Sequence, residues 1–465
     1  MIFSQLLPLF RVFKDTEKKE EKETVEFLWK ISYNKAGDTM NLFPYTDHNK
    51  RYYTLDYYYR QKFGEKIVKV SLNAGFSCPN IDGTVGRGGC IYCSPSGSGE
   101  FAGDQADHLV TQFQKIKKAL EKKWPHAKYI GYFQAHTNTY APLSTLKNCY
   151  ETILKQKDVV GLAIATRPDA ISKECMDYLE SLSKHTFLTI ELGLQTIHEK
   201  TSQFINRCHS LACFENCVNE LRKRGISVVV HIINGLPYET KEMMIATTDY
   251  LNQLDIQGIK IHMLHILKHT KLGIYYQKKP FPILSKEDYV SIVCEQLERL
   301  RPTIVLHRIT GDPDPKDLIE PLWLTKKFNV LNAIDQELEH RKTFQGFQTA
   351  ITYAIQNVLS LAVHPHEYIL NETKLKWQNL LPQSLSFKET KQKEGEKKGK
   401  YALIMTPLTY NIQQIETLLD YLHPQGTLLL LGAKEDTDFP LPHKLYETIH
   451  STEPILIEVR KKTLL

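Results

Sequence analysis

The feature of this sequence that most constrains its fold is a repeated alternation of strand-like runs and amphipathic helical segments. Runs rich in apolar or β-branched residues lie at 66–73, 129–135, 160–166, 187–194, 226–235, 256–266 and 302–310. Amphipathic stretches such as 109–123, 142–157 and 214–224 lie between them. This repeated order is typical of parallel strands joined by crossover helices. We therefore predict an α/β fold, either a barrel or an open sheet.

The polar residues that interrupt this pattern fall where the predicted strands end. They lie at 134–139, 166–169, 195, 235–237 and 310–312. Because the carboxyl ends of parallel strands meet at one edge of a sheet or one mouth of a barrel, chemistry gathers there. We expect the functional site at this edge.

Three cysteines follow the first predicted strand in a glycine-rich loop. Cys78 stands in GFSCPNIDG, and after eleven intervening residues Cys90 and Cys93 stand in GGCIYCS, with two residues between them. Thiolates suit both zinc and iron–sulfur clusters, so the ligand type alone does not choose between them. A structural zinc site needs four ligands, whereas this loop supplies three and no fourth Cys or His follows at zinc-finger spacing. Three thiolates on a four-iron cluster leave one iron open to a substrate or cofactor, so we favour the cluster.

Composition bears on compartment and partners. Nine cysteines, an odd number among 465 residues, do not indicate a disulfide framework, so we expect a reducing, cytoplasmic setting. No run of about 18 apolar residues occurs, so we expect no membrane span. The net charge of +6 is compatible with an RNA substrate without requiring one. We interpret the cysteines outside the loop as structural: Cys149, Cys175, Cys208, Cys213, Cys217 and Cys294.

Composition also divides the chain into five parts. We predict a disordered N-terminal extension at 1–39, the main α/β domain at 40–348, a helical segment at 349–387, a charged linker at 388–400 and a small α/β domain at 401–465. The linker holds six lysines and three glutamates with no apolar residue, which is typical of a solvated segment. Within the last part we predict strands at 401–407, 427–433 and 454–462, a helix at 413–422 and a turn at 423–426.

The cysteine loop and further motifs resemble a known superfamily. A glycine-rich loop that follows the first strand and ends in a Cys-x-x-Cys pair resembles the radical S-adenosylmethionine (SAM) superfamily. The wide first gap departs from that superfamily's commonest three-residue spacing and resembles the branch that includes the Elongator catalytic subunit. Between about Met40 and Gly346, an ordered set of motifs is similar to the YhcC/YtqA-type radical enzymes: RYYTLDYYYRQKFGEK, GGCIYCSPSGSGEFAGD, YFQAHTNTYAP, ATRPDAI, ELGLQTIHEKT, HIINGLPYET, QGIKIHMLHILK, HRITGD and PLWLTKKFNVLNAIDQELE.

This resemblance implies a partial (β/α)6 barrel of the TIM type, a radical SAM barrel with a 4Fe-4S cluster at its mouth. Cys78, Cys90 and Cys93 would bind the cluster, and the open iron would chelate S-adenosyl-L-methionine. One electron would cleave the sulfonium to methionine and a 5′-deoxyadenosyl radical that abstracts a substrate hydrogen. The protein would orient the cofactor and exclude water. A flavodoxin- or ferredoxin-type protein is the implied electron donor.

Residues at the strand ends would hold SAM. The resemblance implies Gln134, Thr137 and Asn138 near the methionine end, Thr166 and Arg167 after the next strand, and Glu191 and Gln195 nearer the ribose. Two of them have a structural alternative, in which Arg167 forms a local ion pair with Asp169 and Glu191 is a buried partner of Lys260.

The resemblance also implies a transfer RNA substrate. The reaction would convert the carboxymethylaminomethyl side chain of the wobble uridine to an aminomethyl one, and in such systems a small class I methyltransferase then methylates the amine. The region 401–465 resembles the later half of such a methyltransferase. We interpret it as a methyltransferase relic or an unrelated docking module, and predict no methyl transfer from it.

Other features keep alternatives open. Aromatic and basic residues before the first strand suit stacking on unpaired bases, or the tyrosines pack on the barrel floor; they are Arg51, Tyr52, Tyr53, Tyr57, Tyr58, Tyr59 and Arg60. His262 and His265 lie on one predicted strand, where at most one can face the interior. The alternative functions are radical chemistry on a small metabolite and a thiolate-bound zinc protein without turnover.

Overall fold

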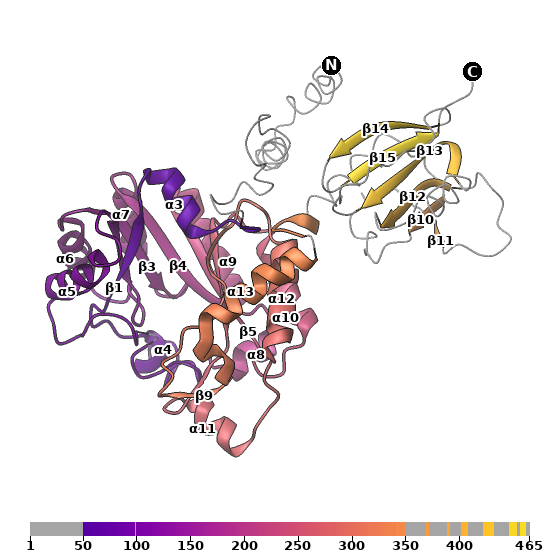
Figure 1. Cartoon of the computed structure of the whole chain (residues 1–465). Helices are drawn as coiled ribbons and strands as arrows, with labels where there is room; N and C mark the ends of the chain where they lie inside the picture. The colour runs from indigo at the N-terminus through magenta and orange to yellow at the C-terminus, as the bar shows by residue number, and fades with distance from the viewer. Residues whose placement is uncertain are drawn as a thin grey trace. The chain divides into compact units, whose positions relative to one another are not determined.

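The computed structural model describes residues 50–97, 99–341 and 343–348, and six strands at 368–371, 388–390, 401–407, 422–431, 446–452 and 456–461. The chain divides into two compact units, and the boundary follows Leu338 (Figure 1). The predicted extension at 1–39 lies outside the described residues. Among the described helices, none is both long and apolar enough to cross a membrane.

The first unit is built on a seven-stranded parallel sheet that curves into a half-barrel (Figure 1). Its order is β1-β2-β3-β4-β5-β6-β8, and every neighbouring pair is parallel. The strands are β1 (Ile67–Leu72), β2 (Lys128–Phe133), β3 (Val159–Thr166), β4 (Phe187–Gln195), β5 (Ser227–Asn234), β6 (Gly258–Met263) and β8 (Val305–Arg308). All seven lie where the sequence predicts strands, so the α/β partial barrel is confirmed, with one strand more than the six of the implied barrel.

Helices connect the strands. They are α5 (Leu109–Glu121), α6 (Leu143–Leu154), α7 (Lys173–Ser183), α8 (Glu199–Phe204), α9 (Leu211–Lys223), α10 (Lys241–Leu251), α11 (Lys271–Lys278) and α12 (Lys286–Arg299). Several begin at a hydroxyl residue whose Oγ accepts a hydrogen bond from the N–H three residues on: Ser172, Ser210, Thr240 and Ser285. Each such cap stabilises its helix by about 1 kcal/mol. These caps fix where the helices that cover the sheet begin.

The remaining elements flank this core. They are α3 (Leu55–Phe63), α4 (Pro79–Asp82), the two-stranded antiparallel pair β7 (Ile266–Leu267) and β9 (Leu318–Glu320), a 3-10 helix (Leu322–Lys326) and α13 (Lys327–His340). The short helix α4 belongs to the cysteine loop, which makes it part of the site described below.

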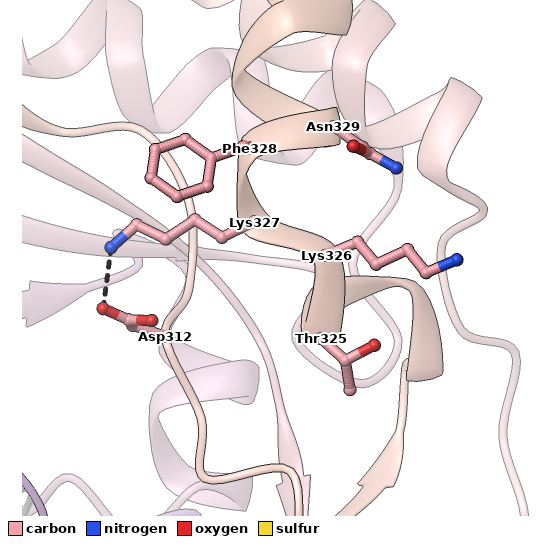
Figure 2. Close-up of a pocket in the computed structure, with 6 residues that line it drawn as sticks. All are labelled: Asp312, Thr325, Lys326, Lys327, Phe328 and Asn329. Atoms are coloured by element: carbon pink, nitrogen blue, oxygen red, sulfur yellow. Dashed lines mark hydrogen bonds and ion pairs between the residues drawn. The ribbon is translucent and has the colours of Figure 1, made fainter.

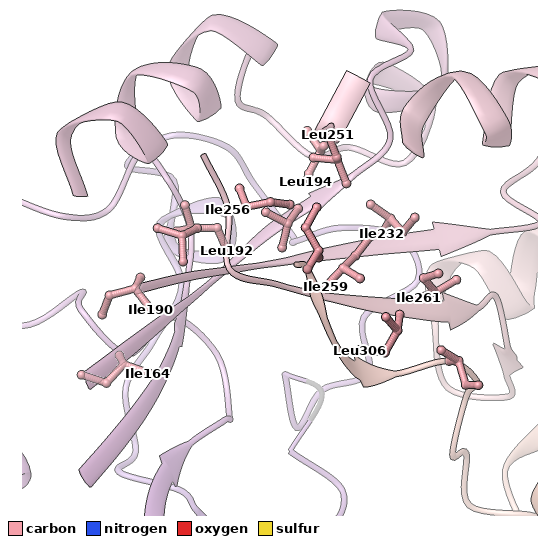
Figure 3. Close-up of a cluster of buried hydrophobic side chains, with 14 of the residues drawn as sticks. Ile164, Ile190, Leu192, Leu194, Ile232, Leu251, Ile256, Ile259, Ile261 and Leu306 are labelled. Carbon is pink, nitrogen blue, oxygen red and sulfur yellow. The ribbon is translucent and has the colours of Figure 1, made fainter. Parts of the chain in front are cut away.

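Alternate residues of the central strands point to opposite faces of the sheet. Those on the outer face are aliphatic and pack against the helices. Figure 3 shows the centre of this core, with Ile164, Ile190, Leu192, Leu194, Ile232, Leu251, Ile256, Ile259, Ile261 and Leu306. Because these strands carry an aliphatic residue at nearly every second position, the sequence reveals where they lie.

The amino end of the half-barrel is closed by aromatic side chains. Tyr59 of α3 is buried with Ile67, Ile130 and Tyr132 at the lower part of the inner face. Its ring lies 6.0 Å from that of Phe187, the first residue of β4. Among the tyrosines considered for RNA contact, Tyr59 confirms the alternative of packing on the barrel floor. Tyr52 is also buried, but in the core between the sheet and the helices.

The second unit contains a six-stranded sheet in the order β11-β10-β12-β13-β15-β14. Its strands are β10 (Tyr368–Asn371), β11 (Lys388–Thr390), β12 (Tyr401–Pro407), β13 (Leu422–Leu431), β14 (Tyr446–Thr452) and β15 (Leu456–Lys461). Strand β15 runs antiparallel to both of its neighbours, and the other pairings are parallel. Strand β12 has the predicted bounds, and β13 and β15 overlap two further predicted strands.

Three local predictions in this unit are wrong. Strand β10 lies in the predicted helical segment, because its short run Tyr-Ile-Leu-Asn follows residues with helical spacing and was counted as part of the same helix. Strand β11 begins the predicted linker, since an edge strand tolerates lysine and glutamate. The predicted turn 423–426 lies inside β13, where the register of pairing with β12 shifts between Tyr401 and Leu403 and accommodates the extra residues. The rest of the segment 349–387, the rest of the linker and most of the predicted helix 413–422 lie outside the described residues.

Candidate active site

The three cysteines lie in the loop that leaves the carboxyl end of β1. Cys78 directly precedes α4, and the N–H of Cys93 donates to the carbonyl of Cys90 at 3.1 Å, which closes a turn around the Cys-x-x-Cys pair. The N–H of Thr137, beyond the end of β2, donates to the carbonyl of Ser77 at 3.2 Å. This backbone contact places the segment after β2 directly beside Cys78.

The same loop is fixed from the opposite side by two later segments. The N–H of Ile91 donates to the carbonyl of Ile205, after α8, at 3.0 Å. The carbonyl of Ile91 accepts from the N–H of Leu272, at the start of α11, at 2.8 Å. The residues between Cys90 and Cys93 are therefore anchored to segments that follow β4 and β6.

Asn80 is a site residue that sequence reasoning missed. Its side chain is buried, and its Nδ2 lies 3.6 Å from the sulfur of Cys90 and donates to the carbonyl of Asn206 at 2.7 Å. Its Oδ1 is buried, and within the described part of the chain it has no hydrogen-bond partner. A Cβ on Gly86 would lie 2.2 Å from this Oδ1, so Gly86 leaves room for the amide. The glycines were expected to admit backbone amides to the sulfurs, whereas here a glycine admits a side-chain amide.

Positive charge faces the thiols. A hydrogen bond with Cys93, together with the charge of Arg167, lowers the pKa of Cys90 to about 6, although burial opposes the shift. Burial lowers the pKa of Arg167, but hydrogen bonds to Asp169 outweigh it, and the nearby thiols Cys90 and Cys78 raise it further. Both thiols therefore lie close enough to Arg167 to share its field. At Cys90 this field favours the thiolate form.

Arg167 also makes the local ion pair that the sequence offered as an alternative. Its Nε and Nη2 donate to the two carboxylate oxygens of Asp169 at 2.9 and 2.7 Å, and its Nη1 donates to the carbonyl of Arg207 at 2.9 Å. The guanidinium is thus held in one orientation beside the cysteine loop.

The donor set of the loop suits an iron–sulfur cluster. Within the described part of the chain, no three His, Cys, Asp or Glu side chains gather closely enough to hold a single metal ion. Ligands of a four-iron cluster bind different irons, so they do not need to meet at one point. Three thiols, an amide donor beside one of them and a nearby guanidinium are what such an anionic cluster requires of its surroundings.

The predicted SAM residues after β2 and β3 form one connected group. The N–H and Nδ2 of Asn138 both donate to the carbonyl of Ala165, at 3.1 and 2.9 Å, and no residue that the structure describes bonds to its buried Oδ1. The hydroxyl of Thr166 lies 2.6 Å from that of Thr139. The N–H of Gln134 donates to the carbonyl of Leu72 at 3.3 Å. The structure thus brings together the ends of β1, β2 and β3, and leaves the Oδ1 of Asn138 available to a ligand.

Backbone conformations that L residues rarely adopt gather at this edge. Gln195, the last residue of β4, has a φ of +63°, and its side chain lies over Gly193, where a Cβ would be 2.4 Å from Nε2. Positive φ also occurs after other strands, at His136, Asn206, Cys208 and Tyr238. Strained residues of this kind are typical of functional sites.

Glu191 lies in the middle of β4 rather than at its end, and its carboxylate is already engaged. It is 1% exposed. Its oxygens accept from Lys69 on β1 at 2.6 Å, from Lys260 on β6, and contact the ring of His231 on β5 at 2.9 Å. The alternative of a buried pair with Lys260 is confirmed, and the ribose contact remains a prediction.

Burial and neighbouring positive charges lower the pKa values of the basic side chains around Glu191. Burial, together with the charges of Lys69 and Arg308, lowers the pKa of Lys260 to about 7, although Glu191 opposes the shift. Burial and the charge of Lys260 lower the pKa of His231 to about 4. The imidazoles here are therefore neutral at physiological pH.

Beyond this layer, the ends of β6 and β8 carry further basic side chains. Arg308 is the register partner of Lys260. His262 is on β6, but the strand ends at Met263, so strand alternation does not apply to His265. Burial lowers the pKa of both histidines, and each lies within the field of Arg308. The prediction that at most one of them faces the interior assumed that one strand carries both histidines, and it stays a prediction.

A separate pocket lies beside the loop after β8. Figure 2 shows its lining residues, Asp312, Thr325, Lys326, Lys327, Phe328 and Asn329. Lys327 donates to Asp312 at 2.7 Å across it. None of the predicted site residues lines this pocket, and we assign it no role.

Two family models match this chain. The model described as the Radical SAM superfamily matches residues 82–251, which include Cys90 and Cys93 and begin after Cys78. The model described as the Radical_SAM C-terminal domain matches residues 256–340. The two matches cover strands β2 to β9 of the first unit.

Several known proteins are similar to it. YtqA of Bacillus subtilis, which carries the name of an uncharacterized protein, is 51% identical over 306 residues, 66% of this chain and 95% of YtqA. YhcC of Escherichia coli K12 is 33% identical over 285 residues, 60% of this chain and 90% of YhcC. The solved structure of the archaeal Methanocaldococcus infernus Elp3 covers 60% of this chain and 64% of its own, with 15% identity and a TM-score of 0.46. Because the YtqA match spans nearly all of YtqA, the similarity is that of a whole domain.

Proposed function

This chain belongs to the radical S-adenosylmethionine superfamily, and from that premise we propose that it converts the carboxymethylaminomethyl side chain of the wobble uridine in transfer RNA to an aminomethyl one. The observation that carries the substrate class is an exposed apolar and aromatic rim around the cysteine loop. The superfamily itself implies the cluster and SAM.

In this proposal the chain's own residues hold the cofactors. Cys78, Cys90 and Cys93 would bind the 4Fe-4S cluster, with the amide of Asn80 donating toward Cys90. The unpartnered Oδ1 of Asn138 is suited to accept a hydrogen bond from the amine of SAM. When bound, the cluster and SAM supply a 5′-deoxyadenosyl radical that removes a hydrogen atom from the substrate. We assign Gln134, Thr137, Thr166, Arg167, Glu191 and Gln195 to SAM binding as part of the same proposal.

The rim consists of exposed hydrophobic side chains in the cysteine loop and in segments packed on it. Eight large hydrophobic side chains are exposed in the described part of the chain, and five of them form this rim: Ile81, Val85, Phe101, Tyr238 and Ile274. Apolar groups gathered in this way around a site mark a surface that a large partner covers. A small metabolite would instead favour an enclosed site, so the rim supports a macromolecular substrate.

Aromatic stacking and positive charge favour RNA as that substrate. Tyr238 is 63% exposed and lies edge-on to Phe204, with ring centroids 5.4 Å apart. Its hydroxyl is 2.9 Å from that of Tyr275, and Phe204 packs in the same cluster as Ile91 of the cysteine loop. Exposed basic side chains lie in the cysteine loop and around α11: Arg87, Lys268, Lys271, Lys278 and Lys279. Unpaired bases bind to surfaces of this composition.

The test uses the full chain, purified without oxygen and reconstituted with iron and sulfide. Transfer RNA from cells that lack this gene is incubated with the enzyme, SAM and dithionite, and its nucleosides are measured by mass spectrometry. We expect loss of the carboxymethylaminomethyl nucleoside, gain of the aminomethyl nucleoside and formation of 5′-deoxyadenosine. Formation of 5′-deoxyadenosine with no change in any transfer RNA nucleoside would refute the RNA substrate. Stoichiometric zinc, no iron and no 5′-deoxyadenosine would refute the radical function.

A further inference from the structure

The interior of the half-barrel carries more positive than negative charge. Lys69, Lys260 and Arg308 project from β1, β6 and β8, and Glu191 is the acidic side chain to which the two lysines are bonded. The surrounding imidazoles are neutral because burial lowers their pKa values. Unbalanced charge in a partly buried interior is unfavourable unless an anion enters.

Arg308 is the cation of this interior that is available to bind an anion. The two lysines share Glu191, but within the described residues Arg308 has no hydrogen-bond or ion-pair partner. It is half-buried at the carboxyl end of β8, where its Cα is paired with that of Lys260. Its field reaches Tyr132 on β2 as well as Lys260 and His262 on β6. Since these side chains come from separate parts of the sheet and all face inward, the guanidinium also faces the interior.

Two further polar atoms nearby lack partners. The Nε2 of His262 and the Oγ1 of Thr310 are buried, and no described residue bonds to either. Lys260 of β6 and Arg308 of β8 are register partners. His262 is two residues beyond Lys260, and Thr310 is two residues beyond Arg308. A buried polar atom left without a hydrogen bond destabilises the fold. His262 lies within the field of Arg308, and Thr310 follows Arg308 at the end of β8. Two such atoms close in the fold to an unpaired guanidinium indicate a place suited to a ligand that accepts hydrogen bonds.

We propose that Arg308, His262 and Thr310 form an oxyanion site inside the half-barrel that binds the carboxylate of the substrate. This inference rests on the proposed function, in which the uridine side chain ends in a carboxymethyl group. A planar guanidinium can bind both oxygens of a carboxylate at once, and an imidazole N–H and a hydroxyl can donate to the same group. SAM also has a carboxylate, but the resemblance assigns it to the open iron beside the cysteine loop. The site at β6 and β8 therefore takes the carboxylate of the substrate.

The first experiment compares the wild type with Arg308→Gln, Arg308→Lys and the control Lys326→Gln, which removes an exposed lysine of the separate pocket (Figure 2). For each reconstituted enzyme, 5′-deoxyadenosine and modified uridine are measured together. We expect Arg308→Gln to lower uridine conversion about 10- to 100-fold and to raise the ratio of 5′-deoxyadenosine to product. Arg308→Lys keeps the charge but loses the paired N–H groups of the guanidinium. Its uridine conversion should therefore lie between that of the wild type and that of Arg308→Gln. An equal loss of both products and weaker SAM binding would show that Arg308 binds SAM, which would overturn the proposal.

The second experiment tests the site without RNA. Iminodiacetate carries the same carboxymethylamine group, and its effect on the melting temperature of the reconstituted full chain is compared with that of sodium chloride at equal ionic strength. We expect a stabilisation of the wild type and of Lys326→Gln that is absent in Arg308→Gln. Stabilisation that persists in Arg308→Gln would overturn the site even if the uridine reaction is confirmed. Stabilisation that depends on Arg308, with no uridine conversion, would refute the proposed RNA substrate and keep the carboxylate site.

Discussion

Single residues set the charge inside the half-barrel, and Glu191 is the one on which the others depend. It contacts cations from β1 and β6 and an imidazole from β5, so it joins strands that are not neighbours in the sheet. Removing one partner of a buried ion pair leaves an uncompensated charge, and this costs more than the pair itself contributes. The stability of the barrel interior should therefore be far more sensitive to Glu191 than to exposed carboxylates.

We predict that Glu191→Gln destabilises the protein by about 3–5 kcal/mol, because Lys69 and Lys260 lose their buried counter-charge. The control is Glu121→Gln, whose carboxylate is exposed and lies 3.7 Å from Lys117. It should change the stability by less than about 0.5 kcal/mol. Urea unfolding followed by circular dichroism measures both. Equal midpoints for the two variants would show that the interior charges do not stabilise the fold.

These inner residues also show what sequence reasoning could and could not reach. The strands were predictable because their outer faces are aliphatic, and the cysteines because their spacing is unusual. Lys69 and Arg308 lie in short apolar runs. The sequence of such a run does not indicate whether its basic residue faces the barrel interior or the helices. That depends on pairing between distant strands, such as the register of Lys260 with Arg308. Asn80 had a local signal, its place next to Cys78 and Pro79, but its approach to Cys90 depends on Gly86.

At the scale of elements, the cysteine loop is held by the strands and helices around it rather than by its own structure. It contains one short helix, α4, and backbone hydrogen bonds tie it to the segments after β2, α8 and β6. Its geometry therefore depends on close packing, and small changes in volume inside the loop should affect the thiols.

We predict that Gly86→Ala lowers the iron content of the reconstituted protein from about four irons per chain to less than half of that. The added Cβ would lie 2.2 Å from the Oδ1 of Asn80, and so would displace the amide that contacts Cys90. Gly225→Ala is the control, because its Cβ meets nothing within 4 Å and its φ of +73° adds strain far from the loop. Iron analysis after anaerobic reconstitution measures both. Full iron in Gly86→Ala would contradict a role for Asn80 in holding the loop.

At the scale of the whole first unit, the exposed rim and the candidate site share one edge. The strands end there, the cysteine loop lies there, and the rim of exposed apolar and aromatic side chains belongs to that loop and to segments packed on it. The opposite edge is closed by α3 and its tyrosines. In the second unit, strands β12, β13 and β15 lie where the C-terminal sequence predicts strands, and β14 is an additional one.

We predict that Tyr238→Ala weakens transfer RNA binding by about 5- to 100-fold, because a stacked base contributes about 1–3 kcal/mol. The control is Phe328→Ala, which removes a side chain that is 74% exposed on α13, outside the rim. Fluorescence anisotropy with labelled transfer RNA at one fixed salt concentration compares the two, since such affinities depend on salt. A loss of affinity of the same size in both variants would mean that the rim does not select the RNA.

The aromatic closure of the amino end has a kinetic consequence. Because the amino end of the half-barrel is closed, cofactor and substrate must enter and leave at the carboxyl ends of the strands. In the proposed function, the bound RNA would cover this same edge. Spent cofactor would then leave only after the RNA has lifted away, so each encounter with a transfer RNA would allow a single turnover. Release of the RNA would then be the rate-limiting step of the cycle. Nucleic acid that binds without reacting would inhibit the enzyme, because it would prevent the cofactor products from leaving.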